Sequence, residues 1–169
     1  YTRAIGAASH VEGYNSRATG NYGAHAEGYY TDASGESSHA EGEETEASGA
    51  DSHTEGYHTK ASGAYGSHAE GYHTRAAGQA SHVEGYCTTA YGHDGAHAEG
   101  YYTTADSDQQ HVQGKYNVVD DRSVYADIIG NGTDQNNKKI LKPQLGQEIK
   151  DLKEIFIYIA MTILQKELN

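Results

Sequence analysis

The chain has 169 residues, about the length of one domain, yet residues 1–114 contain four Val, Ile, Leu, Met and Phe residues against eighteen in residues 115–169. This composition excludes an ordinary enzyme domain with an aliphatic core for most of the chain. Residues 1–114 also hold the whole net charge of −12, and such an acidic surface excludes nucleic acid and anionic membranes as expected partners.

Residues 1–114 form a repeat array. The motif His-x-Glu-Gly recurs every 14 or 15 residues and alternates with Thr-x-Ala-x-Gly, as in Thr31–Gly35. Each repeat therefore contains two short alternating segments closed by Gly, which is typical of an all-β solenoid with two strands per coil. The extra residue of the longer repeats always falls between the second Gly and the next His, so we expect a turn there.

Strict alternation along a repeat places His, Glu, Thr and Ala on one face. We expect this face to point inward. A core of such residues buries little apolar surface, so we expect a homotrimer, a trimeric β-roll or β-helix, in which His of one chain pairs with Glu of its neighbour. The expected inward ladder consists of His10, Glu12, His25, Glu27, His39, Glu41, His53, Glu55, His68, Glu70, His82, Glu84, His97 and Glu99.

The His and Glu columns also allow a metal-binding interpretation, because three chains converging on one axis would bring imidazoles and carboxylates together. Hydrogen-bonded pairing is the simpler interpretation, since the motif repeats without a unique site. An active site needs one pair whose surroundings differ from those of its copies. The sequence therefore predicts no catalytic residue, and we assign no metal and no cofactor.

Tyr follows the motif Gly in six repeats, as at Tyr29 and Tyr57. A stacked ladder at the corners of the coils is one interpretation and a carbohydrate-binding stripe is another. The Thr column would suggest ice binding only if it faced solvent. The position between Tyr and Thr varies, and it supplies four candidate surface contacts, which are Tyr30, His58, His73 and Tyr102.

Residues 115–139 are expected to form a short β adaptor and linker, and residues 140–169 a C-terminal helix in a coiled coil or bundle. The most apolar stretch, 155–164, is about half of the roughly 20 residues that a membrane span needs, so no span is expected. Apolar residues after Pro143 follow the a/d spacing of a coiled coil. The predicted trimerisation or docking residues are Leu145, Ile149, Leu152, Phe156, Ile159 and Ile163.

The segments Ser9–Gly13 and Ser38–Gly42 resemble the Ser-Val-Ala-Ile-Gly repeat of trimeric autotransporter adhesin heads, with His and Glu in the Val and Ile places. The longer pattern Ser-His-Ala-Glu-Gly-Tyr-x-Thr-x-Ala-Ser-Gly is similar to arrays in bacteriophage tail-fibre and neck-appendage proteins. There, segments like Lys115–Asn117 and Tyr125–Thr133 often follow the array. The resemblance implies a trimeric fibre segment of a virion tail or appendage, assembled in the bacterial cytoplasm.

The expected function is therefore structural: a shaft or receptor-binding module for host attachment, not an enzyme. Its expected partners are two further copies of the chain, other tail or baseplate proteins, and a host cell-surface receptor or glycan. Two alternatives share this architecture. One is the head domain of a bacterial trimeric adhesin, and the other is the non-catalytic stalk of a tail depolymerase.

Overall fold

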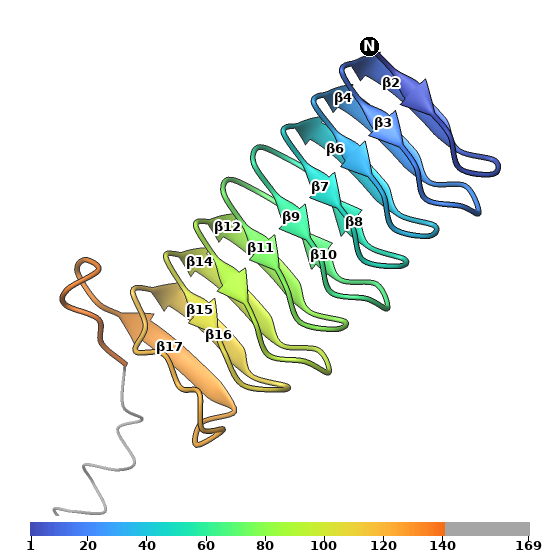
Figure 1. The fold of residues 1–169 in the computed structure, drawn as a ribbon. Coiled ribbons are helices and arrows are strands. Elements are labelled where there is room, and N and C mark those ends of the chain that lie inside the picture. The colour runs from blue at the N-terminus through green and yellow to red at the C-terminus, as the bar shows by residue number, and fades with distance from the viewer. Residues whose placement is uncertain (141–169) are drawn as a thin grey trace, which may run out of the picture.

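The computed structural model describes residues 1–140, which form a stack of parallel coils (Figure 1). Each coil gives one strand to each of two sheets, so the predicted all-β solenoid is confirmed. No helix within these residues is long and apolar enough to cross a membrane. The expected C-terminal helix lies outside the described residues, apart from its first position, and so do all six a/d residues: Leu145, Ile149, Leu152, Phe156, Ile159 and Ile163.

We call the two sheets the short-strand sheet and the His sheet. The short-strand sheet contains eight strands of two residues each. They are β1 (Arg3–Ala4), β3 (Arg17–Ala18), β5 (Asp32–Ala33), β7 (Glu46–Ala47), β9 (Lys60–Ala61), β11 (Arg75–Ala76), β13 (Thr89–Ala90) and β15 (Thr104–Ala105).

The His sheet contains nine strands, and eight of them begin at the motif His. They are β2 (His10–Tyr14), β4 (His25–Tyr29), β6 (His39–Glu43), β8 (His53–Thr54), β10 (His68–Ala69), β12 (His82–Tyr86), β14 (His97–Tyr101), β16 (His111–Lys115) and β17 (Asp127–Asn131).

The register places equivalent residues of successive coils beside one another. In the His sheet His25 pairs with His39, and Gly28 pairs with Gly42. A Cβ atom built on Gly28, whose φ is 120°, would collide with the backbone oxygen of Gly42. The motif Gly is therefore required because successive backbones approach too closely for a side chain.

Small side chains fill the interior of the coils. From the second coil onward, the short-strand sheet contributes the Ala at the end of each strand, and the His sheet contributes the residue between His and Glu. Buried Thr and Ser side chains at the corners complete this thin core. Most buried side chains are therefore small. Fully buried apolar residues are Ala18, Ala24, Ala26, Ala33, Ala40, Ala47, Ala61, Ala69, Ala76, Val83, Ala90, Ala96, Ala98, Ala105, Val112 and Ile128.

The predicted turn of the longer repeats is confirmed. In the shorter repeats this corner has one non-Gly residue with positive φ, such as Ser37. In the longer ones a Gly with positive φ follows such a residue, as in Tyr22-Gly23 and Tyr65-Gly66. Nothing lies within 4 Å of a Cβ atom built on Gly23, so the extra residue bulges into open space.

Within the single chain the His and Glu columns lie on the outer face of the coil, so their expected inward position requires contact with neighbouring chains and stays a prediction. Thr31 and Ala33 are buried as expected, but the buried residue beside His25 is Ala26. The reason is the corner residue Tyr30, which adopts a left-handed φ of 57° and interrupts the alternation between the two strands. The outer face of the His sheet therefore carries His10, Glu12, His25, Glu27, His39, Glu41, His53, Glu55, His68, Glu70, His82, Glu84, His97 and Glu99.

Within the expected adaptor, β17 adds a last rung to the His sheet. It pairs in parallel with β16 over five residues, from His111 and Asp127 to Lys115 and Asn131. Ile128 pairs with Val112 and is fully buried. This part of the chain therefore closes the apolar core with a larger side chain than the coils before it.

Candidate functional site

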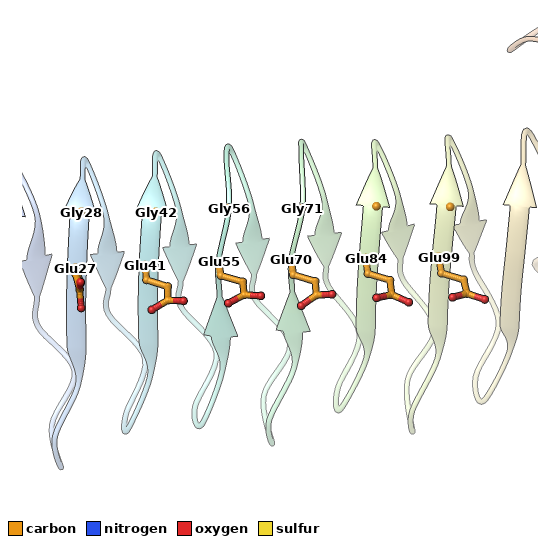
Figure 2. Close-up of a pocket in the computed structure, with 12 residues that line it drawn as sticks. Glu27, Gly28, Glu41, Gly42, Glu55, Gly56, Glu70, Gly71, Glu84 and Glu99 are labelled. Atoms are coloured by element: carbon orange, nitrogen blue, oxygen red, sulfur yellow. The ribbon is translucent and has the colours of Figure 1, made fainter.

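A groove follows the outer face of the His sheet across six coils. It has a volume of about 760 Å³, and the Gly after each Glu keeps it open because it has no side chain. The carboxylates of Glu41 to Glu99 point the same way along the row (Figure 2). The groove is lined by Glu27, Gly28, Glu41, Gly42, Glu55, Gly56, Glu70, Gly71, Glu84, Gly85, Glu99 and Gly100.

The imidazoles form a stacked column beside this groove. Ring centroids of successive His residues lie 4.7 to 5.0 Å apart from His10 to His111. The Nε2 atom is buried and has no hydrogen-bond partner in six of them. These six are His25, His39, His53, His68, His82 and His97.

Each imidazole nevertheless lies close to a carboxylate of the same chain. The distance from His39 Nε2 to Glu41 Oε2 is 3.6 Å, and the distance from His68 Nε2 to Glu70 Oε2 is 3.8 Å. Residues two apart in a strand share a face, which explains this proximity. The His–Glu proximity that was expected between neighbouring chains is therefore already present within one chain.

The carboxylates of successive coils approach one another. A hydrogen bond between Glu55 and Glu70 raises the pKa of Glu70 to about 7, and burial and a further contact with Glu84 raise it as well. Contact with Glu70 lowers the pKa of Glu55, and contacts with Glu99 and Glu70 lower that of Glu84. Two neighbouring carboxylates do not both ionise readily, because their negative charges repel. The pKa of Glu70 therefore rises while the pKa values of Glu55 and Glu84 fall.

Two imidazoles of the column, His68 and His97, are shifted toward their neutral form. Burial lowers the pKa of His68, and the neighbouring His53 and His82 lower it further. Burial also lowers the pKa of His97. Neutral imidazole is the form that binds metal ions, so His68 and His97 are chemically suited to be ligands.

Four groups of three side chains bring an imidazole nitrogen and two carboxylate oxygens within 4.8 Å of one another. Each Glu in the middle of the row belongs to two of these groups. The groups are Glu41–His53–Glu55, Glu55–His68–Glu70, Glu70–His82–Glu84 and Glu84–His97–Glu99.

The four candidate surface contacts occupy the same corner position in four different coils of the solenoid. Tyr30, His58, His73 and Tyr102 all have positive φ. The first three are exposed and Tyr102 is half-buried. The His58 and His73 rings stack at 4.7 Å, and the preceding Tyr column also stacks, as at Tyr72 and Tyr86. The Tyr rings therefore form a stacked ladder, and the carbohydrate-binding interpretation stays a prediction.

Sequence reasoning did not predict a second, smaller hollow on the short-strand sheet. There Lys60 forms an ion pair with Glu46 of the previous coil. Outside this hollow, on the same sheet, Arg17 forms an ion pair with Asp32 of the next coil. Opposite charges at the same motif position in successive repeats would have indicated these pairs. The hollow is lined by Glu44, Glu46, His58, Thr59, Lys60, His73, Thr74 and Arg75.

No protein-family model, curated protein or solved structure matches this chain. The resemblance to phage-fibre and adhesin-head repeats accordingly rests on the motif residues themselves, such as Ser38–Gly42.

Proposed function

We propose that the chain is a structural and host-attachment segment of a trimeric fibre in a phage tail or appendage. The observation that carries the proposal is the uniform register of the solenoid. His25, His39 and His53 stand beside one another, and so do the alanines of the facing sheet. A rod of near-identical coils serves as a shaft or a repeated display surface.

The thin core supports assembly with further copies. Within residues 1–140, the fully buried apolar side chains are all alanines apart from Val83, Val112 and Ile128. An Ala methyl group removes little apolar area from water, so each coil gains little from its own interior. Contacts between chains would add the missing burial, and the apolar spacing expected for residues 140–169 would hold three chains in register.

The exposed corner supports a role in attachment. Tyr30, His58 and His73 are exposed at the same corner position of three coils, next to a column that contains stacked Tyr rings. Amphipathic rings of this kind give large contact areas at low entropic cost. A host glycan or surface receptor is the partner that we propose for this corner.

Repetition of the His–Glu pair supports a structural role over catalysis, because each pair within residues 1–140 has near-identical neighbours. The depolymerase-stalk alternative is tested separately by a polysaccharide-degradation assay on a longer protein that contains this segment.

Sedimentation equilibrium in a buffer that contains a chelator tests the assembly. The full chain should sediment at about three times its mass of 18.2 kDa. Removal of residues 140–169 should lower the number of chains per particle. A full chain that stays at 18.2 kDa would contradict the trimer. A truncated chain that remains trimeric would contradict the role of the C-terminal segment.

A further inference from the structure

The row of Glu–His–Glu groups contains ligands that lack partners. Nε2 of His53, His68, His82 and His97 is withdrawn from water and makes no hydrogen bond. A polar atom in this state costs free energy unless another group pairs with it. A ring nitrogen of each of these residues lies within 4.8 Å of two carboxylate oxygens, and for His68 and His97 the Nε2 atom itself is 3.8 and 4.0 Å from one of them. A positively charged ion is the group that pairs with a neutral imidazole nitrogen and two carboxylates at once.

The contacts among the carboxylates also indicate a positively charged partner. A carboxylate oxygen of Glu70 lies within 4.8 Å of a carboxylate oxygen of Glu55 and of one of Glu84. Carboxylates in such contact repel one another unless a proton or a cation lies between them. The groove beside them is open along its length, so an ion can enter from solvent.

We propose that these groups bind divalent transition-metal ions such as Zn²⁺, with two strong sites per chain. One imidazole and two carboxylates are three protein ligands for Zn²⁺, and a water molecule would complete a tetrahedral set. Imidazole favours Zn²⁺ and related transition metals, whereas Ca²⁺ takes about six to eight oxygen ligands, at least twice the three donors of one group. The proposal concerns one chain and does not depend on the fibre assignment.

The number of ions follows from how the groups share ligands. Neighbouring groups share one Glu, whereas alternate groups share none, as in Glu41–His53–Glu55 and Glu70–His82–Glu84. Ions in neighbouring groups would lie about one coil apart, roughly 4.8 Å, and would repel strongly. Two dications nearly match the charge of the five carboxylates of the row, whereas four would exceed it.

Isothermal titration of ZnCl₂ into the untagged, metal-stripped full chain tests the stoichiometry. We expect saturation near two ions per chain and at least tenfold weaker binding of CaCl₂. The expected thermal unfolding midpoint is higher with Zn²⁺ than with a chelator. Fewer than one ion per chain, or equal affinity for Ca²⁺, would overturn the proposal.

A pair of double variants locates the ions. Glu55→Gln with Glu84→Gln removes one carboxylate from all four groups, and we expect at least tenfold weaker Zn²⁺ binding and no Zn²⁺-induced rise in the unfolding midpoint. Glu12→Gln with Glu27→Gln removes the same charge from the same face but touches none of the four groups. That control should bind two ions as the parent does.

Circular dichroism in chelator checks that both double variants retain the β-solenoid. Equal losses of Zn²⁺ binding in the two variants would show diffuse attraction to an acidic surface and would overturn the proposal. Should Glu55→Gln with Glu84→Gln fail to fold, His53→Gln combined with His68→Gln, His82→Gln and His97→Gln removes the imidazole from every group instead. Unchanged Zn²⁺ binding by that variant would also overturn it.

Discussion

Lys60 Nζ donates to both carboxylate oxygens of Glu46, at 2.7 and 2.8 Å, although the two residues are 14 positions apart in the sequence. They are neighbours because the parallel register pairs β7 with β9. The contact links two successive coils on the outer face of the short-strand sheet.

This ion pair should contribute little to stability because both side chains are about 40% exposed to solvent. A double-mutant cycle with Glu46→Gln and Lys60→Met should give a coupling energy of about 0.5 kcal/mol, which falls further in high salt. Urea unfolding of the four proteins measures it. A coupling well above about 1 kcal/mol would mean that the pair holds the coils together.

Glycine substitutions should distinguish the Gly residues that pack against the next coil from those that face open space. Gly28→Ala places a methyl group against the backbone of Gly42, so it should cost about 3 kcal/mol or more, or prevent folding. Gly23→Ala meets open space and should cost only about 1 kcal/mol for its positive φ. Thermal unfolding of both variants compares them, and similar losses would contradict the close approach of successive coils.

Asp120 should make the end of the solenoid sensitive to acid. Its carboxylate accepts backbone N–H groups of Tyr125 at 2.8 Å and Arg122 at 3.2 Å, and these bonds lower its pKa from the usual 3.8. A lowered folded pKa means that the stabilisation is complete above the unfolded pKa and is lost as pH falls through the folded pKa.

Hydrogen exchange of the Tyr125 amide measures this effect. Its protection should decrease as the pH falls below about 3.8, the ordinary value for Asp, and Asp120→Asn should weaken that dependence. Asp134 provides a control, since it accepts N–H groups in a separate turn at Asn136 and Asn137. If Asp134→Asn changed the Tyr125 amide as much as Asp120→Asn does, the local assignment would be wrong.

The sequence predicted the coils and their turns because repeat spacing and Gly positions reflect backbone geometry directly. It did not predict which face of each strand points inward. The prediction assumed that the alternation continues from one strand to the next, but the left-handed corner at Tyr30 interrupts it. The groove was also missed. Its origin is the Gly after each Glu, such as Gly42, which is required by backbone packing and leaves space beside the carboxylates.

The extra rung at β17 illustrates a second limit. Asp127–Asn131 carries no His-x-Glu-Gly motif, yet it pairs with β16 in full register. The structure buries Ile128 and Gly130 alternately, but the sequence Asp-Ile-Ile-Gly-Asn has adjacent apolar residues and no repeat, so it does not reveal the partner strand.

Small-angle X-ray scattering of the full chain in chelator tests the central claim most directly, because it reports mass and shape together. The account predicts an elongated particle with the mass of three 18.2 kDa chains and the constant cross-section of a rod. A particle with the mass of one chain, or a compact particle of any mass, would contradict it.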